Sequence, residues 1–204
     1  MPFPLTRRKF PVPARLAILS DSQDDTVTVS MASFPLRRER MLRVVERILP
    51  QIDHLNIYLN EYKKVPTELI NEKITVILGK DAAGDLRDNG KFYFLDEVES
   101  GFHFTIDDDI LYPSNYIQQM ILKIEQYGRH AMIGIHGVIF DQPIERFFLR
   151  RTVYGFQRNQ IRDAFVNLIG TGTLGYHTSA IKLELSDFTE TGMADVFIAI
   201  RAKQ

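Results

Sequence analysis

The residues best suited to chemistry in this sequence are three consecutive aspartates, Asp107, Asp108 and Asp109. They directly follow an apolar run, residues 102–106, that is typical of a short buried strand. Carboxylates in such a cluster repel one another unless solvent or a cation screens them, and their hard oxygen atoms suit Mg²⁺ or Mn²⁺. The triplet therefore indicates a divalent-metal site at a strand end, although aspartates also form solvated turns and helix caps.

Further candidates lie on both sides of the triplet. Residues 80–91 combine glycines with both signs of charge, so this loop can wrap a nucleotide while Lys91 meets a phosphate; a polar loop without a ligand is the alternative. Asp195 opens the last helix-like stretch, where an aspartate either caps the helix or serves as a base. His136 and His177 are expected at strand ends, as a third metal ligand, a substrate donor or a hydrogen-bonded structural residue.

The elements that must position these residues alternate between short β-rich runs and helical ones. This pattern favours an α/β fold with a mostly parallel central sheet flanked by helices. Strands are expected at residues 26–30, 54–60, 73–78, 102–106 and 131–135. Helices are expected at residues 36–49, 91–99 and 159–168, and between a Ser114 cap and residues 127–128. The glycine-rich run 170–175 is interpreted as turns, and the mixed segment 136–167 as structure that faces an acceptor.

The turn after the first predicted strand is the position where a Rossmann-like fold receives a nucleotide. A helix N-terminus there favours negative charge, and an arginine can donate to a base, ribose or phosphate. Ser33 and Arg38 are therefore expected to contact a nucleotide. As a group, the arginines of this segment suit a solvated helix face, and only those of the first turn are candidates for contact: Arg37, Arg38, Arg40, Arg43 and Arg47.

Composition limits the classes of function. The 204 residues are 45% hydrophobic and 25% charged, which suits one globular domain with a real core. The absence of cysteine removes disulfides, zinc–thiolate sites and thiol nucleophiles. A net charge of -1 offers no general attraction for nucleic acid, and no apolar run is long enough to span a bilayer. A cytoplasmic protein is expected, with peripheral association at the inner face of the membrane left open.

Two segments are expected in the chain. Residues 1–25 contain prolines and clustered basic residues, and we interpret them as an arm or linker, either solvated or touching anionic lipid or a lipid-linked acceptor. Residues 26–204 form the predicted domain. An amphipathic stretch that starts near Met193 still continues at Gln204, so we expect the domain to extend past this residue.

A resemblance rests on several of these pieces in their order along the chain. The segment 107–113 after a strand is similar to the DxD region of GT-A glycosyltransferases, especially the family-2-like bacterial enzymes that build capsular and other surface polysaccharides. The other matching pieces are Ser33-Phe34-Pro35-Leu36-Arg37, the loop from Gly84 to Phe92, Gly170-Thr171-Gly172-Thr173 and Met193-Ala194-Asp195.

The resemblance implies a role for each of these sites. Asp107 and Asp109 form the DxD pair that holds Mn²⁺ or Mg²⁺, and Asp107 and Asp108 also contact the donor. Asp85 and Lys91 contact the nucleotide, residues 170–175 line the sugar and acceptor pocket, and Asp195 is the general base. The sequence departs from the family at Ala194, where many relatives carry a second acid.

The function implied is metal-dependent transfer of a sugar from a nucleoside-diphosphate donor, UDP-sugar above all, to a saccharide or lipid-linked acceptor, with inversion. Two alternatives stay open: a non-catalytic saccharide-binding or scaffolding domain, and a sugar nucleotidyltransferase. The sequence identifies neither the sugar nor the acceptor, and membership of a larger polymerase also stays open.

Overall fold

The chain folds around one five-stranded sheet. The computed structural model describes residues 25–98, 100–141, 146, 149, 151–155 and 162–203. The strand order is β3-β2-β1-β4-β8, in which only β8 is antiparallel to its neighbour. These strands span Thr26–Ser33 (β1), His54–Leu59 (β2), Ile74–Leu78 (β3), Gly101–Asp107 (β4) and Thr173–His177 (β8). The architecture is thus α/β with a mostly parallel sheet, as the sequence predicts.

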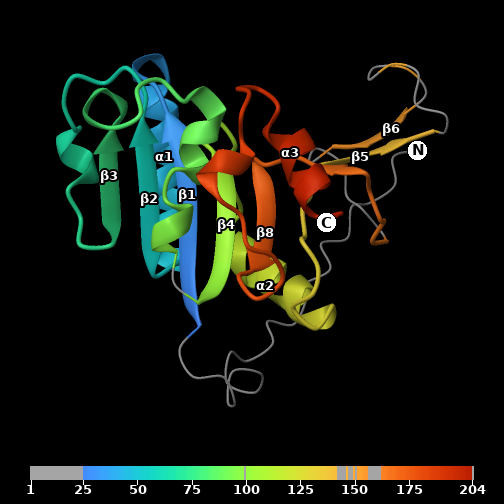
Figure 1. Cartoon of the computed structure of the whole chain (residues 1–204). Coiled ribbons are helices and arrows are strands. Elements are labelled where there is room, and N and C mark those ends of the chain that lie inside the picture. The colour runs from blue at the N-terminus through green and yellow to red at the C-terminus, as the bar shows by residue number, and fades with distance from the viewer. Residues whose placement is uncertain are drawn as a thin grey trace, which may run out of the picture.

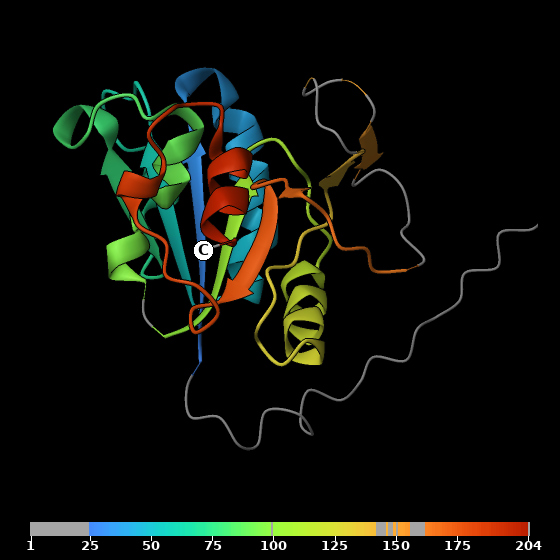
Figure 2. The ribbon, with the colours of Figure 1, turned by 45° about the vertical axis from the view of Figure 1, so that its right-hand side comes forward.

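Helices and short helical turns cover both faces of this sheet. Two helices, α1 (Arg38–Ile48) and α2 (Tyr116–Gln126), lie on one face, and α3 (Ala194–Arg201) lies on the other (Figures 1 and 2). The α3 face is also covered by the 3₁₀ helix Arg87–Phe92, which contacts β1, β2 and β4. The result is a three-layer arrangement with the carboxyl ends of four parallel strands along one edge.

Strand alternation divides the core into two parts. On β4, Phe102, Phe104 and Ile106 point into the cluster under α1 and α2. Successive side chains of a strand point to opposite faces, so His103, Thr105 and Asp107 lie on the α3 face. Asp107 therefore ends β4 on the same side as the 3₁₀ helix and α3.

A second, smaller antiparallel sheet lies beyond the β8 edge (Figure 1). Its strand order is β6-β5-β7, with β5 at Gly137–Phe140, β6 at Arg151–Tyr154 and β7 at Leu168–Ile169. None of the helices in the described part of the chain has the length and apolarity that spanning a bilayer requires.

Four local predictions are wrong. Residues 131–135 make no strand but one isolated bridge, between Ile133 and Gly175, because they only touch the free edge of β8. Residues 91–99 are not one helix: their described part ends one short 3₁₀ helix and holds another, Leu95–Glu97. The run 170–175 is not all turn, since β8 begins at Thr173. Asn115, rather than Ser114, occupies the cap position of α2.

Two predictions extend beyond the described residues. Of the predicted helix 159–168, residues 159–161 lie outside them, and the described remainder is irregular chain that leads into β7. The predicted arm lies outside them except for Asp25, which pairs with Arg129 and His177 at the amino end of the sheet.

Candidate functional site

Two adjoining pockets open at the carboxyl edge of the sheet. We call the first, of about 390 Å³, the β1 pocket. It is lined by Ala32, Ser33, Phe34, Arg37, Asn60, Glu61, Asp85, Arg87, Asp88, Lys91, Asp107 and Asp108. We call the second, of about 300 Å³, the α3 pocket. It is lined by Asp88, Lys91, Asp107, Ile110, His136, Gly170, Thr171, Gly172, Thr173, Gly192, Ala194 and Asp195. Asp88, Lys91 and Asp107 line both pockets and so form the wall between them.

The position of these pockets follows from the strand order. The chain runs outward from β1 through β2 to β3 and then returns to the other side of β1 with β4. The order reverses between β1 and β4, and ligands of open α/β sheets bind outside the carboxyl ends of the strands at such a switch point. Ser33 ends β1 and Asp107 ends β4, so both predicted residues lie at this point.

Asp107 is held on three sides. Its carboxylate accepts a hydrogen bond from the ammonium of Lys91, a side chain only 3% exposed. Its backbone N–H donates to the Tyr112 hydroxyl at 2.9 Å, and this hydroxyl donates to the Gly172 carbonyl. A Cβ added at Gly172 would overlap the Asp107 carboxylate. Gly172 is therefore required for close approach of the 170–173 segment to the end of β4.

Asp108 and Asp109 share one arginine. The Arg37 guanidinium lies 2.8 Å from Asp108 Oδ1 and 3.0 Å from Asp109 Oδ2. The hydrogen bond to Asp108 outweighs the opposing effect of burial, and the pKa of Arg37 is raised above its usual value. Asp108 is 3% exposed, and its second oxygen, Oδ2, has no hydrogen-bond partner among the described residues. A buried carboxylate oxygen without a donor is costly, so this atom can accept a donor from a ligand in the β1 pocket.

The loop that carries Asp85 and Lys91 is fixed by buried polar groups on β2 and just after it. The side-chain amide of Asn60 donates to the Arg87 carbonyl at 3.0 Å and accepts from the Leu86 N–H at 3.0 Å. Tyr58 donates its hydroxyl to the Gly84 carbonyl at 2.8 Å, and its ring fills the space that a Cβ at Gly90 would need. The loop is thereby held over the strand ends.

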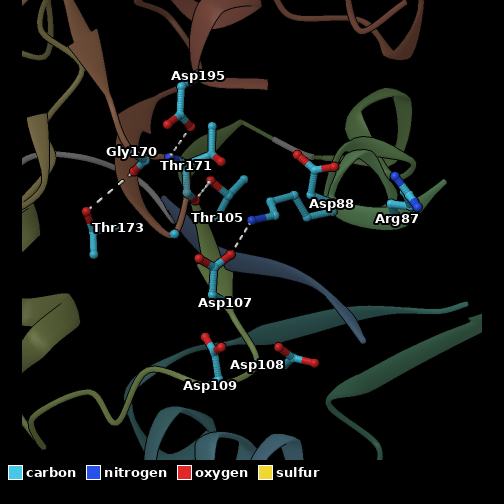
Figure 3. A network of polar contacts seen from close by, with 12 residues as sticks. Arg87, Asp88, Thr105, Asp107, Asp108, Asp109, Gly170, Thr171, Thr173 and Asp195 are labelled. Carbon is cyan, nitrogen blue, oxygen red and sulfur yellow. Dashed lines mark hydrogen bonds and ion pairs between the residues drawn. The ribbon is translucent and has the colours of Figure 1, made fainter. Parts of the chain in front are cut away.

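Asp195 is connected to β4 through the 170–173 segment. Its Oδ1 accepts the Thr171 N–H at 2.8 Å, and the Thr171 carbonyl accepts the Thr105 hydroxyl at 2.6 Å. Figure 3 shows this chain of contacts beside Asp107, with Asp108 and Asp109 on the other side of Asp107. Thr105 lies two residues before Asp107 on the same face of β4, so one strand supports both carboxylates.

Most of the residues predicted from the sequence meet at these pockets. Ser33, Asp85, Lys91, Asp107 and Asp108 line the β1 pocket, and His136 and Asp195 join Lys91 and Asp107 around the α3 pocket. Asp109 adjoins them through Arg37, with its side chain 33% exposed.

Two predicted positions are not brought to the pockets. Arg38 pairs with Glu68 on the surface and lines neither pocket, and Arg37 takes the place expected for it. His177 ends β8, which is antiparallel, so it lies at the opposite edge of the sheet beside Asp25.

Sequence reasoning also missed Asn60, Asp88 and Tyr112. Asp88 lines both pockets and accepts the Gly192 N–H at 2.8 Å. A polar residue at the end of the predicted strand 54–60 was the available signal for Asn60. For Tyr112 the sequence offered no signal, because its partner Gly172 is distant along the chain.

The carboxylates fit a magnesium or manganese ion only with help from a ligand. Within the described residues, no three or more His, Cys, Asp or Glu side chains gather closely enough to hold a metal. The prediction that His136 completes a three-ligand set with Asp107 and Asp109 therefore has no support from the geometry. Magnesium in nucleotide sites is commonly held by one or two carboxylates together with substrate phosphates. Asp107 and Asp109 suit that kind of site, because both side chains are partly exposed at one strand end.

A buried histidine ties together the strands that carry the site. His103 on β4 hydrogen-bonds Ser30 on β1 at 3.0 Å and the Tyr176 hydroxyl on β8 at 2.8 Å. Complete burial lowers the pKa of His103 to about 4, so the ring is neutral near pH 7. It therefore acts as a structural link rather than as a catalytic base.

Comparison with known proteins adds no relative: no protein-family model matches the chain, and no curated protein matches it.

Proposed function

We propose that this chain is a metal-dependent glycosyltransferase of the GT-A type, which transfers a sugar from a nucleoside diphosphate, UDP in the first instance, to a hydroxyl acceptor. The observation that carries the proposal is the place of Asp107. It ends β4 at the switch point of the sheet and forms the wall between a pocket that holds Ser33 and Asp108 and a pocket that holds Asp195.

The two pockets suit the two parts of such a donor. The β1 pocket offers Asp108 Oδ2, Asp85 and Asn60 as hydrogen-bonding groups for a nucleoside. The α3 pocket then takes the sugar, and the diphosphate lies at the wall, where Lys91 can donate to it. Arg37, on the Asp108 and Asp109 side, is a second cation for the phosphates.

The charge of the pockets also supports a metal. Among the described lining residues, six carboxylates face three cationic side chains, Arg37, Arg87 and Lys91. This excess of negative charge favours a divalent cation, for which Asp107 and Asp109 are the ligands available. When bound, such an ion supplies neutralisation of the charge that develops on the departing diphosphate.

Asp195 is the proposed general base. In one displacement the acceptor hydroxyl gives its proton to Asp195, its oxygen bonds to the anomeric carbon, and the bond from that carbon to the diphosphate oxygen breaks. The Thr171 N–H holds one oxygen of Asp195, which orients the carboxylate toward the α3 pocket. A displacement from the face opposite the leaving group inverts the anomeric carbon.

The test is transfer activity with variants that separate binding from chemistry. The protein is assayed with Mn²⁺ for release of UDP from a panel of UDP-sugars, with simple saccharides as acceptors. Asp195→Asn keeps an acceptor for Thr171, so we expect donor affinity within about twofold and turnover lower by about 100-fold. Asp81→Asn, at an exposed carboxylate outside both pockets, is the control and should behave as the parent protein. Equal turnover of all three proteins would contradict the role of Asp195.

A second candidate function is a domain that binds the nucleotide sugar without transferring it. It is favoured by one observation: Lys91 already neutralises Asp107, and the described residues contain no ready-made three-ligand metal group. Donor binding without UDP release from any donor and acceptor tested would support this second function.

A further inference from the structure

We infer that the sugar carried by the donor is uncharged, a neutral hexose or N-acetylhexosamine rather than a hexuronic acid. The inference rests on the proposed function and concerns the α3 pocket, which at about 300 Å³ has room for one sugar ring. It follows from the charges that surround this pocket.

Carboxylates dominate the lining of the α3 pocket. Among its described lining residues, three carboxylates, those of Asp88, Asp107 and Asp195, outnumber two basic side chains, Lys91 and His136. Lys91 is buried and already paired with Asp107 at the wall to the β1 pocket. The positive charge of a metal bound at this wall would be neutralised by the negative charge of the diphosphate. The metal would therefore leave no positive charge for an acidic sugar.

The two remaining carboxylates are oriented to accept hydrogen bonds. Asp88 Oδ1 accepts the Gly192 N–H at 2.8 Å, and Asp195 Oδ1 accepts the Thr171 N–H at 2.8 Å. In each case the other oxygen makes no further bond to a described residue. The free oxygen of Asp88 can accept a sugar hydroxyl or amide N–H, while that of Asp195 remains for the acceptor hydroxyl.

An acidic sugar would meet repulsion in this pocket. A carboxylate on a hexose here would lie within a few ångströms of Asp88 or Asp195, where like charges at low dielectric repel strongly. The backbone segment Gly170–Thr173 offers no cationic side chain to offset the repulsion. Neutral hydroxyls, by contrast, can donate to Asp88 and meet no repulsion from Asp195.

The experiment compares UDP, UDP-glucose, UDP-N-acetylglucosamine and UDP-glucuronate by calorimetric titration in the presence of Mn²⁺. We expect at least one neutral donor to bind at least tenfold more tightly than UDP-glucuronate. The double variant Asp88→Asn/Asp195→Asn keeps both backbone contacts but removes both charges, and the ratio should fall to about threefold or less. Asp85→Asn is the matched control: this carboxylate lines only the β1 pocket, so all four affinities should change together and the ratio should persist.

The outcomes separate the two levels of the proposal. If UDP binds but UDP-glucuronate binds as tightly as both neutral donors, the inference about the sugar is wrong while the nucleotide site stands. The same conclusion follows if the double variant keeps the ratio of the parent protein. If UDP itself does not bind with Mn²⁺, the proposed function fails, and the inference fails with it.

Discussion

Tyr112 and Tyr116 provide a sharp test of how the site is held together. The two rings lie side by side, with centroids 4.7 Å apart, and both are buried. The Tyr112 hydroxyl links the Asp107 N–H to the Gly172 carbonyl, whereas the Tyr116 hydroxyl has no hydrogen-bond partner among the described residues. Burial raises the pKa of both phenols, so both are neutral at pH 7. Phenylalanine at either position removes one oxygen and little else.

The expected effects of these substitutions differ in size. Tyr112→Phe leaves a backbone donor and a backbone acceptor without partners, each costing about 1–3 kcal/mol. Water that enters from the α3 pocket can replace part of the lost hydrogen bonding to these two backbone groups. We therefore expect a net loss of about 2–3 kcal/mol in the free energy of unfolding. Tyr116→Phe removes a buried hydroxyl that makes no hydrogen bond to the described residues, so we expect no loss of stability and a gain of up to about 1 kcal/mol.

Urea denaturation followed by far-ultraviolet circular dichroism measures both effects, because this signal does not depend on the substituted tyrosines. At constant slope, the shift of the midpoint gives the change in the free energy of unfolding. Equal midpoints for the two variants would refute the assignment of Tyr112 as the link between β4 and the 170–173 segment. A larger loss in Tyr116→Phe would refute it as well.

Two further predictions concern the same strands. The pKa of His103 is about 4 in the folded chain, compared with 6.5 for an unperturbed ring. Between these two pH values only the unfolded chain takes up a proton at this residue. The free energy of unfolding therefore falls as the pH is lowered from 6.5 to 4. From pH 7 to pH 5, this residue should lower the free energy of unfolding by about 2 kcal/mol. In urea titrations, His103→Gln should lose that part of the pH dependence. Identical pH profiles for the variant and the parent protein would show the assignment to be wrong. Gly172→Ala would force the Asp107 carboxylate to move, so we expect at least tenfold weaker binding of UDP with Mn²⁺, measured by calorimetry. Gly155→Ala, whose added Cβ would meet no atom of the described residues within 4 Å, is the control, and equal affinities of the two variants would contradict the role of Gly172.

Much of the sheet could be predicted from the sequence, because its elements follow local patterns. The four parallel strands, α1 and α2 all carry apolar residues at the period of their element, and each was placed to within a few residues. The antiparallel strand β8 was missed because its glycine suggested a turn. Gly175 instead makes room for the Phe104 ring of the neighbouring strand, a contact distant in sequence.

The site was predicted where it depends on strand ends and was missed where it depends on packing. Asp107 and Asp108 follow a recognisable strand, and their meeting with Ser33 follows from the parallel order. Arg38 was expected to make the contact that Arg37 makes, because the sequence did not show that Pro35–Arg37 form a 3₁₀ turn before α1 begins. With fewer residues per turn, this segment points Arg37 rather than Arg38 at the carboxylates.

The roles of the 170–173 segment show the same limit. Its glycines suggested turns, but Gly170 packs on the His136 ring and Gly172 on Asp107. Local sequence does not reveal which side chain a glycine admits, since the partner comes from another strand. Asp195 was identified by resemblance, and its hydrogen bond to Thr171 gives that identification a geometric setting without testing catalysis.

The central claim is that the end of β4 binds a nucleoside diphosphate together with a divalent metal. The most direct measurement is calorimetric titration of UDP into the protein with and without Mn²⁺, repeated on Asp109→Asn and on the surface control Asp81→Asn. We predict binding that requires Mn²⁺, that weakens at least tenfold in Asp109→Asn, and that is unchanged in Asp81→Asn. Absence of UDP binding, or equal binding with and without the metal in all three proteins, would contradict the claim.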